Sequence, residues 1–194
     1  MSYTAMKRVA AAAGVSIAAV LVAIPSGALA ASGCSAPTLS APFVAFGDTN
    51  LYALVPGQAA DMFSGTGWTM TGGATIVTTT LYDGSKGNVL DLPSGATAVS
   101  PPMCVDNTYP TARAMERTVA GGNAGVTVSV TYSVTGTTNI GDFKGGPGAW
   151  SPSKTVNIQS TDLTTPQLAQ FTFVGKSNKS DYQLYDFYVD PRMH

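Results

Sequence analysis

One segment, in which apolar and polar residues alternate strictly, constrains the fold of this chain more than any other feature. In Val126–Thr135, valine and Tyr132 occupy the even positions, whereas Thr and Ser occupy the odd positions. Successive side chains of a β-strand point to opposite faces of the sheet, and β-branched residues favour strands. The segment therefore predicts a half-buried antiparallel strand.

Shorter segments of the same kind recur along the chain. They are Thr75–Leu81, Val89–Leu92, Ala112–Thr118, Thr155–Gln159, Leu168–Val174 and Tyr182–Val189. Clusters of turn residues such as Asp83-Gly84-Ser85 separate them, and no window after the N-terminal segment has apolar residues at helical spacing. Many short strands at this spacing predict a single all-β domain, an antiparallel β-sandwich of the jelly-roll type.

The N-terminal segment has the pattern of a secretory signal peptide. Lys7 and Arg8 precede the apolar stretch Val15–Ile24, and the small residues of Ala28-Leu29-Ala30 form a cleavage site. The apolar stretch is shorter than the roughly 20 residues that a membrane span needs. We therefore predict a signal peptide over residues 1–30, a domain over residues 31–194, and a secreted, extracellular or cell-wall-associated protein.

Two cysteines, Cys34 and Cys104, follow the predicted cleavage site. In an exported chain, an even number of cysteines predicts a disulfide. This bridge would close a loop of about 70 residues and contribute roughly 4 kcal/mol in the chain-entropy model. The alternative is lipidation of Cys34, because Gly33 supplies the small residue that such a site needs, although Ala31 stands where leucine is usual.

The charge of the chain disfavours nucleic acid as a partner. The whole sequence has 10 basic and 11 acidic side chains, and removal of Lys7 and Arg8 leaves a net charge of about −3. The sequence contains no basic stripe that would follow a phosphate backbone or an anionic membrane surface.

One segment resembles the first block of the GDS(L)-type esterases. Val44–Thr49 contains Phe46-Gly47-Asp48, but Thr49 stands where those enzymes have their nucleophilic serine. His194 is the only histidine and the last residue, where it is poorly placed to act as a general base. We therefore predict that the domain is not an enzyme.

A second resemblance covers both ends of the predicted domain. Leu54–Gly57, Gly65–Trp68 and Gly72–Ala74 resemble the opening of family-four and family-nine carbohydrate-binding modules and related galactose-binding-like jelly rolls, and Tyr182–Asp190 resembles their last strand. The resemblance implies a jelly roll that binds carbohydrate. In those modules, acids near the first strand and on the last strand often hold a structural calcium ion. Asp61 and Asp186 are the matching residues here, and Ca²⁺ prefers such oxygen ligands.

The predicted domain also resembles a family of secreted actinobacterial proteins that has no assigned activity. The matching segments are Pro42-Phe43, Phe46–Asp48, Leu54–Gly57, Leu92–Gly95, Ser100–Val105 and Tyr188–Pro191. This resemblance spans most of the chain after the signal peptide, but it implies no ligand.

The segment Asn139–Ser153 is rich in Gly and Pro and predicts a long loop. Trp150 and Phe143 lie in it, and Tyr109 lies in a second Pro-containing connection. Aromatic rings on such loops can stack on sugars, so these three residues are the candidate ligand site. The alternative for Trp150 is packing against the end of the sandwich, and we expect Trp68 in the core. The sequence thus favours a non-catalytic module for an extracellular glycan or cell-envelope component. The alternative is a structural or protein-interaction domain of the cell envelope without a small-molecule site.

Overall fold

A computed structural model describes residues 37–190 except 107, 122–124, 160–165 and 177–178. The predicted signal peptide, Cys34 and His194 lie outside the described residues. The elements are β1 (Leu39–Ser40), the short 3₁₀ helix η1 (Val44–Phe46), β2 (Tyr52–Leu54), β3 (Thr69–Thr71), β4 (Thr75–Thr80), β5 (Lys86–Pro93), β6 (Thr97–Val99), β7 (Met103–Val105), β8 (Thr111–Ala120), β9 (Val126–Tyr132), β10 (Gly136–Phe143), β11 (Ser151–Pro152), β12 (Val156–Asn157), β13 (Gln167–Gly175) and β14 (Asp181–Asp190).

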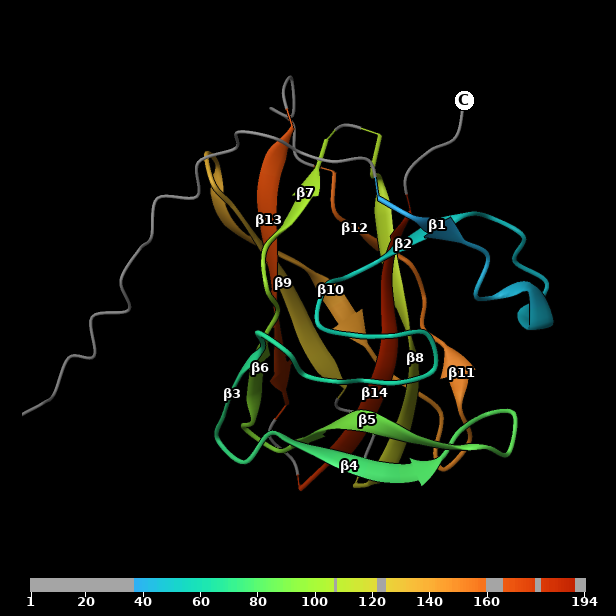
Figure 1. Cartoon of the computed structure of the whole chain (residues 1–194). Helices are drawn as coiled ribbons and strands as arrows, with labels where there is room; N and C mark the ends of the chain where they lie inside the picture. Colours follow the sequence, from blue (N-terminus) through green and yellow to red (C-terminus); the bar gives the residue numbers. More distant parts are fainter. Residues whose placement is uncertain (1–36, 107, 122–124, 160–165, 177–178, 191–194) are drawn as a thin grey trace, which may run out of the picture.

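The strands form two antiparallel sheets that pack face to face (Figure 1). The first sheet has eight strands, with β14 at its centre and β1, β2, β4, β5, β8, β11 and β12 around it. The second sheet has six strands, in the order β10-β9-β13-β6-β3, with β7 also paired to β13. The predicted antiparallel β-sandwich is therefore confirmed. Among the described residues, no helix is long and apolar enough to cross a bilayer.

A bulge in β14 decides which side chains reach the outer face of the first sheet. β14 pairs with β8 along one edge, and the register shifts between Tyr185 and Tyr188. Asp186 lies in this shift with a φ of 52°, a left-handed conformation that is uncommon for a residue with a side chain. The extra residue resets the alternation, so Phe187 packs against Phe173 of the second sheet while Tyr185 contacts Trp150.

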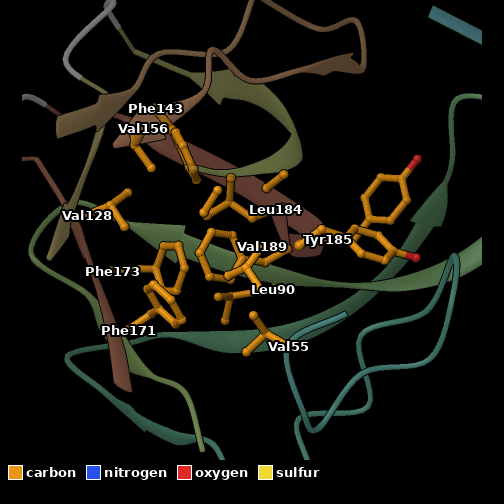
Figure 2. Close-up of a cluster of buried hydrophobic side chains, with 14 of the residues drawn as sticks. Val55, Leu90, Val128, Phe143, Val156, Phe171, Phe173, Leu184, Tyr185 and Val189 are labelled. Atoms are coloured by element: carbon orange, nitrogen blue, oxygen red, sulfur yellow. The ribbon is translucent and has the colours of Figure 1, made fainter. Parts of the chain in front are cut away.

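The core between the sheets is rich in aromatic rings. Phe187 lies 4.9 Å from Phe171, 4.8 Å from Phe173 and 6.2 Å from Phe143 between ring centroids. Figure 2 shows Phe143 among these side chains, together with Leu184 and Val156. Trp68 is also buried, as expected, and contacts Phe63 and Phe173. This packing couples the two sheets, because residues of both contribute to one cluster.

The Gly- and Pro-rich segment is shorter as a loop than the sequence predicts. Its first residues belong to β10, which pairs with β9 through a register shift between Asn139 and Gly141. Its last residues include β11, in which Pro152 lies opposite Met115 of β8. Glycine is tolerated at a bulge and proline on a short edge strand, so neither residue type prevents pairing here. The connection itself covers residues 144–150, and we call it the 144–150 loop.

Candidate functional site

Three connections and one strand meet above the first sheet and enclose a solvent-exposed groove of about 420 Å³. We call it the aromatic groove, and define it by Phe46 of η1, Thr80 and Tyr82 at the β4–β5 connection, Arg117 of β8, and Gly148 and Trp150 of the 144–150 loop. Phe46 and Tyr82 are 40% and 42% exposed, and their ring centroids lie 5.3 Å apart. The volume falls in the range of small-ligand sites, which is roughly 300–1,000 Å³.

Trp150 lies across the outer face of the first sheet. Its Nε1 donates a hydrogen bond of 2.8 Å to the carbonyl oxygen of Thr80, and its ring meets that of Tyr185 edge to face at 4.7 Å. The Arg117 guanidinium lies over the same ring, 4.5 Å from its centroid. Such contacts contribute roughly 0.5–2 kcal/mol each. They hold the half-buried indole in one orientation while part of it faces the groove.

Residues of β8 hold the 144–150 loop in place. Thr118 donates from its backbone N–H to Gly146 and from its hydroxyl to Gly145, and it accepts a bond from the Gly148 N–H. A Cβ atom on Gly145 would lie 2.8 Å from Cα of Arg117, so only glycine fits this approach. The groove wall is therefore fixed by the scaffold, which lowers the ordering cost of binding a ligand.

Glu116 lies beneath the same loop and is buried. Its Oε2 atom is buried and has no hydrogen-bond partner among the described residues. Burial raises the pKa of Glu116 to about 7, although the backbone N–H groups of Gly145 and Lys144 act in the opposite direction. This buried acid supports the loop from below and does not line the groove.

An ion pair fixes the segment that carries Phe46. Asp48 accepts a hydrogen bond of 2.5 Å from Nη1 of Arg113 and one of 2.6 Å from the Tyr52 hydroxyl. Burial opposes the charge on Asp48, but hydrogen bonds from Tyr52, the Asn50 N–H and Arg113 hold its pKa below the ordinary value. Asp48 thus takes part in a structural contact. Thr49 next to it is exposed, and the described residues include no histidine that could act as its general base.

The structure separates the three predicted ligand-site residues. Trp150 lines the groove, whereas Phe143 is 1% exposed and lies in the core at the end of β10. The prediction that Phe143 binds ligand is therefore wrong, because a ring enclosed between the sheets cannot stack on a ligand. Tyr109 is 7% exposed, and it is not among the residues that line the groove.

Sequence reasoning missed Phe46, Tyr82 and Arg117. Phe46 lies in the segment that resembles the GDS(L)-type esterases. Tyr82 lies beside a turn, where an aromatic residue alone does not indicate a ligand site. The two-residue alternation of a strand places Arg113 and Arg117 on one face of β8. It gave no indication that Trp150 would cover that face.

The predicted calcium ligands lie next to each other. The Asp61 N–H donates a hydrogen bond of 2.9 Å to Oδ1 of Asp186, and both residues have left-handed φ values of 57° and 52°. Burial raises the pKa of Asp186 to about 7, and the nearby Asp61 carboxylate adds to the shift. In the described part of the chain, no group of three or more His, Cys, Asp or Glu gathers as a metal cluster would.

Cys104 lies half-buried in β7. Because Cys34 lies outside the described residues, the Cys34–Cys104 bridge stays a prediction.

The fold is similar to those of carbohydrate-binding modules. A family 6 carbohydrate-binding module from Clostridium cellulolyticum in complex with xylose aligns with a TM-score of 0.43 and 15% identity, covering 60% of this chain and 88% of that chain. A family 11 module of a cellulosomal cellulase of Clostridium thermocellum aligns with a TM-score of 0.41 and 12% identity, covering 82% and 98%.

Part of an enzyme is also similar. An arabinose-bound α-L-arabinofuranosidase aligns with a TM-score of 0.42 and 14% identity, covering 68% of this chain and 24% of that chain. No protein-family model and no curated protein matches this sequence. At these scores and identities the solved structures assign neither a ligand nor a site to this chain. The resemblance to secreted actinobacterial proteins stays a prediction.

Proposed function

We propose that this protein is an exported, non-catalytic module that binds a glycan in the aromatic groove. The observation that carries the proposal is the arrangement of Phe46, Tyr82 and Trp150 around one exposed groove. Aromatic rings pack against the C–H faces of sugars, while polar groups at the rim bind hydroxyl groups. Neither a buried ring such as Phe143 nor an isolated surface aromatic offers this combination.

The shape of the groove favours a small or linear ligand over a protein. Its wall is made by the pinned 144–150 loop and its floor by Arg117, both held by hydrogen bonds to the first sheet. A preformed site of this size suits one or a few sugar rings. A protein interface would need a patch larger than this groove, because specific interfaces bury about 800 Å² on each partner.

The proposal includes a structural calcium ion at Asp61 and Asp186. The buried carboxyl group of Asp186 lies at the bulge in the central strand, where it accepts a hydrogen bond from the Asp61 N–H, and the nearby Asp61 carboxylate raises its pKa. A cation there would favour the ionised form of Asp186, and Ca²⁺ accepts carboxylate, carbonyl and water oxygens in irregular loops. The ion would link the β14 bulge to the segment before β3 and so stabilise the fold beside the groove.

A glycan array with the purified protein tests the proposed function, with affinities then measured by calorimetry on the best ligand. We expect Tyr82→Ala and Trp150→Ala to lower the affinity about thirtyfold, which corresponds to roughly 2 kcal/mol for a central stacked aromatic ring. Tyr82→Ala is the cleaner variant, because Trp150 also supports the fold through Tyr185 and Thr80.

Val134→Ala is the matched control, since Val134 is 75% exposed and lies outside the groove. It should retain the full affinity. A ligand that binds wild type, Tyr82→Ala and Trp150→Ala equally well would place the site elsewhere, and the absence of binding to any glycan would refute the proposed function.

A further inference from the structure

Arg117 lies in the floor of the aromatic groove and makes no ion pair with an acidic side chain of the described residues. The ion pairs among the described residues are Arg113–Asp48 and Lys176–Asp142, and neither involves Arg117. Its Nε and Nη2 donate to Oε1 of Gln183 at 2.9 and 2.6 Å, and Nη2 also donates to Oγ1 of Thr79 at 2.7 Å. Both acceptors are neutral, so these bonds orient the guanidinium group without neutralising its charge.

Hydrogen bonds connect Arg117 to a carboxylate only through an intervening side chain. Nε2 of Gln183 donates a bond of 2.8 Å to Oδ1 of Asp91, so the amide side chain stands between the carboxylate and Arg117. Burial lowers the pKa of Arg117 from its ordinary value, while Tyr185 and Asp91 act in the opposite direction. The guanidinium group thus loses part of its hydration without gaining a direct ion pair, an arrangement that favours an incoming anion.

One side of the guanidinium group remains available. Its Nη1 makes no hydrogen bond with the part of the chain that the structure describes, and the group lies over the Trp150 ring. A ligand whose sugar ring lies beside Trp150 would bring its substituents close to this nitrogen. An oxygen of a carboxylate or sulfate group would make a charge-assisted bond there, about twice as strong as a neutral one.

Charged side chains of both signs lie near the groove at the β4–β5 connection. Nζ of Lys86 donates a bond of 2.7 Å to Oγ1 of Thr80, which lines the groove. The carboxylates of Asp61, Asp83 and Asp186 raise the pKa of Tyr82, after the larger effect of burial. None of these three acids is among the residues that line the groove. Arg117 is the charged residue of that lining.

We propose that the preferred ligand is an acidic glycan, whose ring carboxylate or sulfate binds Arg117 while its rings pack against Trp150, Tyr82 and Phe46. The inference rests on the proposed function and names the ligand class for the same groove. It also predicts salt-sensitive binding, because an exposed charge pair is screened by added salt.

The test is an array of paired oligosaccharides. Each uronate oligosaccharide is printed beside its carboxyl-reduced neutral counterpart, and each sulfated oligosaccharide beside its desulfated counterpart. We expect wild type to bind at least one acidic member tenfold or more tightly than its neutral partner in 20 mM NaCl, and the preference to shrink in 500 mM NaCl. The pair that shows the preference distinguishes carboxylate from sulfate.

Arg117→Gln should remove the preference, so that the acidic and the neutral member of each pair bind with equal affinity. Lys176→Gln is the control for the change in net charge, because Lys176 pairs with Asp142 at the second sheet. Melting temperatures of both variants show whether they fold. The comparison of acidic with neutral oligosaccharides on wild type does not depend on the variants. Equal or tighter binding of the neutral members would overturn this inference and leave the glycan-binding function intact. No binding to any member, acidic or neutral, would refute both.

Discussion

Raising the pH from 4.5 to 8 is expected to lower the free energy of unfolding by about 3 kcal/mol through Glu116 alone. Burial raises the pKa of Glu116 to about 7 in the folded protein, from its ordinary value of 4.5. Between these values the folded state keeps a proton that the unfolded state has released. The stabilisation is therefore complete below pH 4.5 and is lost as the pH rises through 7.

Urea unfolding of wild type and Glu116→Gln at several pH values measures this effect. Glutamine keeps an oxygen that can accept the N–H groups of Gly145 and Lys144, but it does not titrate. The variant should be more stable than wild type at pH 8 and show a flatter profile. Asp83→Asn is the control, because Asp83 lies in an exposed turn, and its profile should follow that of wild type. Parallel profiles for wild type and Glu116→Gln would show that this acid does not titrate as described.

Asp186 adds a contribution of the same sign, and calcium provides a way to remove it. The pKa of Asp186 is raised to about 7 by burial and then by Asp61, so the calcium-free protein also loses stability as Asp186 ionises. Calcium binds the ionised form and should raise the free energy of unfolding more at pH 8 than at pH 5. Asp186→Asn should lose this response. An identical calcium response in that variant would contradict the proposed metal site.

Phe143→Ala is expected to lower the free energy of unfolding by roughly 3–5 kcal/mol. The ring of Phe143 is buried and contacts Phe173 and Phe187, so its removal leaves a cavity between the two sheets. Thermal and urea unfolding measure the loss. Phe46→Ala is the matched control, because Phe46 is 40% exposed in the groove and should change stability by about 0.5 kcal/mol or less.

The order of the two phenylalanine variants should be reversed when glycan affinity is measured instead of stability. Phe46→Ala should weaken glycan binding, whereas folded Phe143→Ala should keep most of its affinity because its side chain does not reach the groove. A small stability loss for Phe143→Ala would contradict the core position of this ring.

The long strands were predictable because their alternation is local. Val126–Tyr132 carries β-branched or aromatic residues at a period of two, Tyr182–Val189 is rich in aromatic residues, and both are strands in the structure. β10 was not predicted, because its glycines and exposed polar residues resemble those of a loop. Its pairing with β9 comes from a neighbouring strand and a bulge, which a local pattern does not reveal.

The candidate site was predictable only in part, for a similar reason. Trp150 stood out because a large ring in a Gly/Pro-rich segment is unusual, and Asp61 and Asp186 followed from a resemblance. Phe46, Tyr82 and Arg117 come from three different elements, and only the folded sheet brings them together with Trp150. Phe143 was misplaced because proximity in sequence to Trp150 was taken for proximity in space.

The indole N–H signals of the two tryptophans give the most direct test of glycan binding in the aromatic groove. The chain contains only Trp68 and Trp150, so a nitrogen–proton correlation spectrum has two indole signals, which Trp68→Phe and Trp150→Phe assign. Trp68 is buried against Phe63 and donates to the Pro56 carbonyl, so it serves as the internal control. On titration with the best oligosaccharide from the array, the Trp150 signal should shift and saturate while the Trp68 signal stays in place. Saturable binding by calorimetry with an unmoved Trp150 signal would contradict the groove as the site.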